Sequence, residues 1–376
     1  MQKTQHTAIW LSCLSIALAM IVGAAGTVQM PRTAHAAETK VAAIPLPAKK
    51  PPVPASAADY RMKKRPPTAK QLFGTVKSGA PLAARAVGYY TRGCLAGGKA
   101  LEINGPGWQV MRLSRNRNWG HPQLIALVER LAREATEAKE WPGLLVGDIS
   151  QPRGGPMISS HRSHQVGLDA DVWLTPMPDR TLTNREREDM SAISMLAADM
   201  VSVNPRVWGE GQEKLIKRAA SYPEVERILV HPALKKALCK SPGADASWLS
   251  KVRPVFGHYY HFHIRLSCPK SSPTCKSQNP PGNNDGCGKE LDYWLKRVAP
   301  KPAPKVVEKK PSKPSLPPFP QPEMKLSDMP NECATVLKAG GHKLPTEYER
   351  VVDRSKDAAP ARAVAPASTI INATNR

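Results

Sequence analysis

The chain has 376 residues, with 54 Lys and Arg against 31 Asp and Glu, a formal net charge of +23, and 38 Pro. A hydrophobic content of 41% is enough to bury a core, which excludes wholesale disorder and a collagen-like fibre. Proline is about twice as frequent as usual, so we expect much of the length to be linker, with one folded core. The positive charge fits nucleic acid, an acidic surface or a polyanionic wall polymer, and only its distribution can distinguish these partners.

The first 36 residues have the pattern of a secretory signal peptide. Lys3 precedes a charge-free apolar run from Ala8 to Gly26, and Ala34-His35-Ala36 supplies an A-x-A cleavage site before Ala37. A membrane anchor is the alternative, but polar and small residues weaken the run as a span. We therefore expect export to the periplasm, with no transmembrane span left after cleavage.

Two proline-rich, basic segments follow the pattern of extended linkers. Residues 37–85 hold 8 Pro and 10 basic residues against 2 acidic ones, and residues 299–325 hold 9 Pro in 27 residues with 6 Lys against 2 Glu. Together they carry +12 of the +21 that remains once the signal peptide is removed. This charge indicates either solvated spacers or weak attraction to an anionic wall or membrane, rather than a folded nucleic-acid surface.

Residues 86–298 have a globular composition, and we expect one α+β domain with a small, mainly antiparallel sheet flanked by helices. The elements predicted in chain order are a helix at 121–139, strands at 143–149 and 168–174, helices at 184–201 and 212–220, a strand at 228–230, a helix at 233–239 and a strand at 260–266. Beyond the second linker, a segment at 326–356 contains a short helix at 333–338, and we expect the tail at 357–376 to be disordered.

Cysteine usage fits an oxidising compartment. Loss of Cys13 with the signal peptide leaves an even six, which predicts three disulfides that brace the domain. Six cysteines allow 15 pairings, and the sequence favours only a short loop between Cys268 and Cys275. A cysteine-bound zinc is the alternative, but no C-x₂-C pair is present.

Five of the eight histidines of the mature chain fall in two short clusters. These are His161-Arg162-Ser163-His164 and His258-Tyr259-Tyr260-His261-Phe262-His263. In a strand, residues i and i+2 face the same way, so His261 and His263 project together while Phe262 enters the core. Two imidazoles are thereby presented to one point, which a lone core histidine does not do.

The first cluster leads into a strand with carboxylates on one face. Gly167 allows a turn after His164, and the alternation of residues 168–174 places Asp169 and Asp171 on a shared face. Imidazoles and a carboxylate are the ligands of catalytic zinc, at about 2.0–2.2 Å, with a fourth position for water. Spacing alone leaves Asp169 and Asp171 as rivals for the carboxylate ligand.

The longer sequence around these two motifs resembles that of a known family. His164 followed by Asp171, with a distant His261-x-His263, is similar to the metallopeptidase superfamily of lysostaphin, the D-Ala-D-Ala metallopeptidases and the hedgehog domains. The runs at 154–171 and 261–269 resemble one branch, the penicillin-insensitive murein endopeptidases. The resemblance extends from about Gly93 to Leu295, with a weaker echo at Cys333.

The resemblance implies a role for each matching residue. His164, Asp171 and His263 would bind one catalytic zinc, His261 would act as base or transition-state stabiliser, and His258 would have a similar role. His161 matches a family histidine that can hold an additional metal. The partner segment of the family has an acid followed three residues later by His, whereas this chain has Asp199 and Ser202, which argues against a second zinc. The implied disulfides are Cys94–Cys333, Cys239–Cys287 and Cys268–Cys275.

The function implied is hydrolysis of peptidoglycan cross-bridges between D-Ala and meso-diaminopimelate by zinc-activated water, insensitive to penicillin because no serine is acylated. Serine motifs such as G-x-S-x-G are absent. Arg265, Arg112 or Arg153 would meet stem-peptide carboxylates. The alternatives are a zinc D,D-carboxypeptidase or amidase on the same polymer, and a non-catalytic wall-binding module. We expect no nucleic-acid partner, and the oligomeric state is open.

Overall fold

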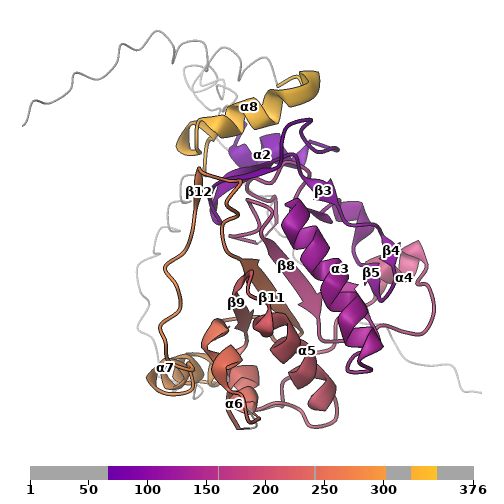
Figure 1. The fold of residues 1–376 in the computed structure, drawn as a ribbon, viewed down its shortest axis with the longest axis vertical. Helices are drawn as coiled ribbons and strands as arrows, with labels where there is room; N and C mark the ends of the chain where they lie inside the picture. The colour runs from indigo at the N-terminus through magenta and orange to yellow at the C-terminus, as the bar shows by residue number, and fades with distance from the viewer. Residues whose placement is uncertain (1–66, 160, 241–242, 302–322, 345–376) are drawn as a thin grey trace, which may run out of the picture. The chain divides into compact units, whose positions relative to one another are not determined.

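The structure is a computed structural model that describes residues 67–159, 161–240, 243–301 and 323–344 (Figure 1). The predicted signal peptide and tail, and most of both predicted linkers, lie outside these residues. Within the described part of the chain, no helix combines the length and the apolar character needed to cross a membrane.

A seven-stranded sheet forms the centre of the domain, in the order β10-β9-β11-β8-β7-β5-β4. Its strands are β4 (Asn104–Gly105), β5 (Trp108–Val110), β7 (Leu144–Val146), β8 (Asp169–Trp173), β9 (Val225–Val230), β10 (Val252–Pro254) and β11 (His261–Leu266). Only the β10–β9 and β5–β7 pairs are parallel among the pairings of this sheet. The prediction of a mainly antiparallel sheet in an α+β domain is therefore confirmed, although the sheet is larger than expected.

Helices pack against one face of this sheet and flank its ends (Figure 1). They are α3 (Pro122–Glu137), α4 (Asn184–Asp189), α5 (Glu210–Ser221), α6 (Pro232–Lys240) and α7 (Lys289–Val298). α3 begins where predicted because the His121 ring accepts a hydrogen bond from the Gln123 N–H and Pro122 occupies the first turn.

The predicted helix at 184–201 is wrong beyond its first turns. A capping box between Thr183 and Glu186 starts α4, but the helix ends at Asp189. The backbone then bonds to other segments, since the Ile193 N–H donates to the Thr175 hydroxyl and the Met195 N–H to the Tyr259 carbonyl. Met195 is buried by this extended docking rather than by a helical face.

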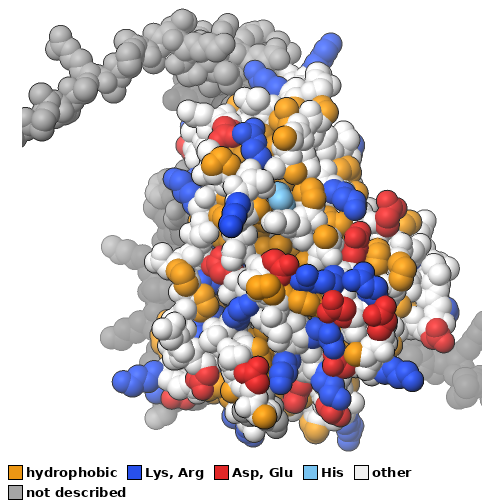
Figure 2. Space-filling model, in the orientation of Figure 1, with side chains coloured by type: hydrophobic (Ala, Val, Ile, Leu, Met, Phe, Trp, Pro, Cys, Tyr) orange, Lys and Arg blue, Asp and Glu red, His pale blue; other side chains and the backbone are white. Residues whose placement is uncertain are grey.

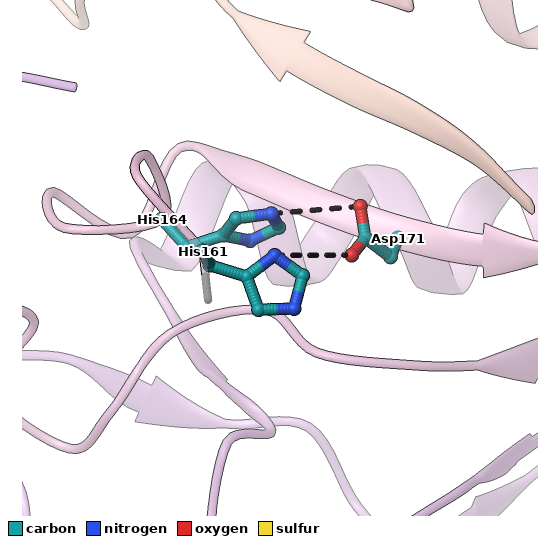
Figure 3. Close-up of side chains that lie close together, drawn as sticks. All are labelled: His161, His164 and Asp171. Atoms are coloured by element: carbon teal, nitrogen blue, oxygen red, sulfur yellow. Dashed lines mark ion pairs between the residues drawn. The ribbon is translucent and has the colours of Figure 1, made fainter. Parts of the chain in front are cut away.

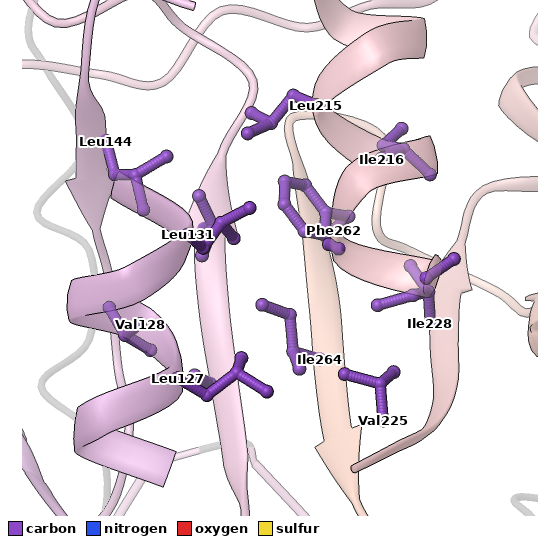
Figure 4. Packing of buried hydrophobic residues seen from close by; sticks show 14 of the residues in the cluster. Leu127, Val128, Leu131, Leu144, Leu215, Ile216, Val225, Ile228, Phe262 and Ile264 are labelled. Atoms are coloured by element: carbon purple, nitrogen blue, oxygen red, sulfur yellow. The ribbon is translucent and has the colours of Figure 1, made fainter. Parts of the chain in front are cut away.

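The main core lies between the sheet and helices α3 and α5. Leu127, Val128 and Leu131 of α3 meet Leu215 and Ile216 of α5 over the inward side chains of β9 and β11 (Figure 4). Phe262 and Ile264 alternate with His261 and His263 along β11, so burial of the apolar pair turns the histidines to the opposite face.

A second apolar cluster joins the two ends of the described chain. Helices α2 (Ala69–Gly74) and α8 (Glu332–Lys338) pack on the three-stranded sheet of β1 (Arg85–Tyr89), β2 (Arg92–Ala96) and β12 (Cys275–Lys276). The remaining strands, β3 (Lys99–Ala100) and β6 (Trp119–Gly120), pair with each other. Residues 67–85 were predicted as linker, but Leu72, Phe73 and Val76 are buried in this cluster.

Three disulfides brace the described chain, and they are the pairings that the family resemblance implies: Cys94–Cys333, Cys239–Cys287 and Cys268–Cys275. The first fixes α8 to β2. Basic and acidic side chains are interspersed on the face of the domain seen in Figure 2, in keeping with a large part of the excess charge lying in the proline-rich segments.

Candidate metal centre

Two neighbouring strands carry the polar residues of the site in register. On β8 and β11, Asp171 lies opposite His263 and Asp169 lies opposite Arg265. All four side chains are almost entirely buried. The sheet thus brings together residues that are about 90 positions apart in the sequence.

The loop before β8 places His164 against the same point. Gly167 has φ +70°, and a Cβ there would lie 2.6 Å from the Leu95 side chain and 2.9 Å from the His121 amide nitrogen, so only glycine fits. The Asp169 carboxylate accepts a hydrogen bond of 2.9 Å from the backbone N–H of His164, which fixes the end of the loop to the strand.

Three imidazoles converge on one carboxylate oxygen. The distances to Asp171 Oδ1 are 3.1 Å from His263 Nδ1, 3.5 Å from His164 Nε2 and 3.5 Å from His261 Nε2. His161 approaches the other oxygen, with Nδ1 3.9 Å from Oδ2 (Figure 3). One ligand atom from each of His161, His164 and Asp171 lies within 4.8 Å of the others.

The hydrogen bonds around the cluster leave ligand atoms free. His164 Nδ1 lies 2.6 Å from the Ile149 carbonyl, so it carries the proton and leaves Nε2 with a lone pair. Among the described residues, His164 Nε2 and Asp171 Oδ1 are buried without a hydrogen-bond partner. His263 Nε2 lies 3.0 Å from Asp169 Oδ1, which orients the opposite nitrogen, Nδ1, toward Asp171. Buried lone pairs that face one another fit a divalent metal, which would pair them all.

The carboxylates create a strong negative potential at this point. Burial opposes ionisation of Asp171, but electrostatic attraction to the His261 and His164 imidazoles outweighs it and holds the pKa of Asp171 well below the usual value. Burial alone would lower the pKa of His164, yet Asp171, Asp169 and Asp148 raise it to about 9. The negative field that favours a proton on His164 Nε2 would also favour a metal cation there, and a bound cation would displace that proton and take the lone pair.

His258 lies beside His261, one of the three imidazoles that approach Asp171. Their ring centroids are 4.9 Å apart, and the His258 ring lies 5.7 Å from that of His263. Burial, and then the neighbouring imidazoles, lower the pKa of His258 to about 3, and burial lowers the pKa of His261. Burial therefore favours the neutral form of both imidazoles.

Sequence reasoning missed Asp148, which holds His161. Asp148 Oδ2 lies 3.1 Å from His161 Nε2, 2.9 Å from Arg117 Nη1 and 3.1 Å from Arg115 Nη1. Burial raises the pKa of Asp148, but the hydrogen bond from His161 and the charges of Arg117 and Arg115 outweigh it and lower the pKa to about 2. The available signal was an acidic residue near the end of the apolar strand predicted at 143–149.

A cavity of about 310 Å³ opens beside the cluster. Its walls include Arg112, His161, Asp171 and His261 together with residues that the sequence did not single out. The latter are Arg115, Gly147, Asp148, Trp173, Ser191, Ala192, Tyr259 and Tyr260. A substrate in this cavity would therefore contact the histidine–carboxylate cluster directly.

The structure does not bring Asp199 to the site. Asp199 Oδ1 accepts hydrogen bonds from the backbone N–H groups of Val201 and Ser202, at 3.0 and 2.9 Å, in an exposed turn.

The fold and the site define a class, an α+β domain whose sheet presents a buried histidine–carboxylate cluster at the floor of a cavity. The family model described as penicillin-insensitive murein endopeptidase matches residues 86–338, and the chain belongs to this family of peptidases. Proteins of that name from Haemophilus influenzae and Klebsiella pneumoniae are 44% identical over 226 residues and 40% identical over 235 residues. These matches cover 60% and 62% of this chain, and 77% and 84% of the relatives.

Proposed function

We propose that this chain is a zinc-dependent endopeptidase that hydrolyses the peptide cross-bridges of peptidoglycan at the bond between D-Ala and meso-diaminopimelate. The observation that carries the proposal is the convergence of His164 Nε2 and His263 Nδ1 on Asp171 Oδ1, at 3.5 and 3.1 Å. The names of the relatives support the polymer as substrate.

His164, Asp171 and His263 would hold the metal. Zinc, when bound, polarises the scissile carbonyl and lowers the pKa of a water molecule to about 7. The His164 tautomer is fixed by the Ile149 carbonyl and the His263 ring is held by Asp169, so neither ligand must reorient to bind metal. His161 lies close enough to replace His263 in this set, and the experiment below separates the two.

His261 is the proposed proton carrier. Its ring lies beside Asp171 and on the wall of the cavity, and the neutral imidazole can accept the proton of the attacking water and return it to the leaving amine. His258, 4.9 Å away between ring centroids, would assist by holding the ring of His261 and stabilising charge in the transition state. No serine is acylated in this scheme, which accounts for insensitivity to penicillin.

We place this activity in the periplasm, because the apolar run and A-x-A site at residues 1–36 would direct export. The three disulfides are compatible with that oxidising compartment.

Digestion of purified sacculi tests the proposal. The wild-type protein should convert cross-linked dimers to monomers, lose activity to a chelator, and recover it with zinc. His263→Ala and Asp171→Ala should lose both zinc, measured by mass spectrometry, and activity, whereas His342→Ala, a histidine outside the cluster, should lose neither.

Other outcomes would contradict parts of this scheme. Release of free D-Ala without loss of dimers would identify a carboxypeptidase, and an effect on the wall that survives chelation would identify a binding module. If His161→Ala loses zinc while His263→Ala retains it, the ligand set is His161, His164 and Asp171.

A further inference from the structure

Two arginines, Arg112 and Arg115, line the cavity beside the histidine–carboxylate cluster, and their guanidinium groups have different hydrogen-bond partners. Arg112 donates hydrogen bonds to the backbone carbonyls of Arg187, Glu188 and Met190 and stacks 5.5 Å from the Trp173 ring centroid. Its donors are thus directed into the protein. Arg112 was one of three arginines expected to meet a substrate carboxylate, and its contacts are those of a structural residue.

The other two expected arginines are also engaged elsewhere. Arg265 donates to the Asp169 carboxylate at 2.7 and 3.0 Å, and its side chain is 7% exposed. Arg153 is buried and donates to the Ser78, Val336 and Leu337 carbonyls. Neither faces the cavity.

Arg115, by contrast, lines the cavity with donors to spare. Its side chain is 44% exposed, and its one hydrogen bond to the described residues is from Nη1 to Asp148 Oδ2, at 3.1 Å. Nε and Nη2 therefore have no hydrogen-bond partner among the described residues and remain available to a ligand. Arg117, which shares Asp148, is only 10% exposed and also donates to the Ser159 hydroxyl.

The backbone holds Arg115 in place. It ends a short 3₁₀ helix, η1 (Leu113–Arg115), whose flanking residues Arg112 and Asn116 both have positive φ. The Ser114 N–H and hydroxyl donate to the Glu188 carboxylate at 2.8 and 2.9 Å, and the Asn116 side chain donates to the Lys77 carbonyl. With the backbone fixed and Nη1 bonded to Asp148 Oδ2, the guanidinium group loses less freedom when it binds a ligand.

Asp148 connects Arg115 to the histidine–carboxylate cluster. The same oxygen, Oδ2, that accepts from Arg115 lies 3.1 Å from His161 Nε2, and His161 Nδ1 lies 3.9 Å from Asp171 Oδ2. Asp148 thus links Arg115 to His161, and His161 lies next to Asp171, a proposed metal ligand.

The proposed substrate carries an anion at a matching place. In the cross-bridge, the scissile nitrogen belongs to diaminopimelate, and the carbon that bears this nitrogen also bears a free carboxylate. We propose that Arg115 binds this carboxylate of the leaving group, through Nε and Nη2, and thereby selects substrates with a free carboxylate next to the scissile bond. This inference rests on the proposed endopeptidase function.

Two matched cross-linked peptides test it, one with the free carboxylate on that carbon and one with a carboxamide. The wild-type protein should have a kcat/KM about 10- to 100-fold higher for the carboxylate peptide, as expected for a charged hydrogen-bonded pair. Arg115→Gln should lose this preference by reducing kcat/KM for the carboxylate peptide alone. Arg115→Lys should restore part of it, because Lys keeps the charge without the planar fork. Arg185→Gln makes the same charge change at a side chain that is 92% exposed in α4, and should behave as wild type.

The zinc content of every variant is measured in parallel. Equal losses on both peptides, or loss of zinc in Arg115→Gln, would show that Arg115 only supports Asp148 and would overturn the inference. A wild-type protein without preference would overturn it as well. A wild-type protein that binds zinc but cleaves neither peptide would refute the proposed function itself, and that result is distinct from a change in preference.

Discussion

Replacement of Asp169 by Asn changes a carboxylate that supports the proposed metal ligands and leaves the ligands themselves unchanged. Asp169 is fully buried and accepts hydrogen bonds from Arg265 Nε at 2.7 Å, from Arg265 Nη2 at 3.0 Å and from the His164 N–H at 2.9 Å. His263 Nε2 lies 3.0 Å from Asp169 Oδ1. Asn has nearly the same shape, so the substitution removes the charge and leaves the packing intact.

The expected loss of stability follows from the burial of the partner. Arg265 is 7% exposed, and without Asp169 its charge would be left unpaired, which costs about 3–5 kcal/mol. The Tyr90 ring, 4.1 Å from the guanidinium carbon, and Gln278, which accepts a hydrogen bond from Arg265, both remain. The asparagine oxygen can also keep one of the bonds, so we expect the lower end, about 3 kcal/mol.

A second effect concerns the metal. His263 would lose the carboxylate that orients its ring, and loss of such a supporting group weakens metal binding by about 10- to 100-fold. Asp171→Asn should instead abolish tight zinc binding, because it changes a proposed ligand.

Two assays measure these effects separately. Urea unfolding of the chelated proteins gives the free energy of unfolding without a contribution from zinc. Competition with a chromophoric chelator gives the zinc affinity. An Asp169→Asn variant within 1 kcal/mol of wild type would refute the role of the buried ion pair. If Asp169→Asn loses zinc completely while Asp171→Asn keeps it, the carboxylate ligand has been assigned to the wrong residue.

Two further predictions concern the fold. Substitution of both Cys94 and Cys333 by Ser, which opens a loop with a sequence separation of 239, should lower the free energy of unfolding by about 5 kcal/mol in urea. The same change at Cys268 and Cys275, separated by 7, should cost about 2 kcal/mol, and the reverse order would contradict the loop-closure argument. His231 is buried and its ring accepts from the Ala233 N–H, and burial lowers its pKa to about 4. Since the unfolded chain protonates this ring near pH 6.5, stability should fall between pH 6.5 and 4. His231→Asn, which keeps a cap acceptor, should reduce that fall by about 3 kcal/mol, and identical pH profiles would exclude the effect.

Periodicity predicted the strands and helices that carry the site because they have one apolar and one polar face. β11 alternates polar and apolar residues throughout, and β8 does so from Asp169 to Val172, so the direction of the two aspartates and two histidines follows from the burial of the residues between them. The helix predicted at 184–201 failed for the complementary reason. Met195 is buried where the backbone bonds to the chain near Thr175 and Tyr259, and no local pattern encodes those contacts.

The two ends of the described chain show the same limit. Residues 67–85 belong to the segment 37–85, whose 8 Pro and 10 basic residues indicate a linker. Helix α2 is nevertheless stabilised by packing against α8, which is more than 250 residues away, and by the sheet that Cys94–Cys333 joins to α8. Composition describes a segment by itself and therefore cannot anticipate a partner so distant in the sequence.

By itself, the sequence determined the chemistry, since the paired histidines, the alternating carboxylates and the even cysteine count are local patterns with a direct physical meaning. Only the tertiary structure decided which charged side chains are paired within the protein and which remain available to a substrate. The sequence suggested Arg112, Arg153 and Arg265 as partners of a substrate carboxylate and did not single out Arg115. In the structure, those three donate to backbone carbonyls or to Asp169, whereas Arg115 lines the cavity and its guanidinium group pairs with Asp148 alone among the described residues. The reason is that a buried charge must be paired within the protein, and the identity of its partner depends on segments that meet only after folding.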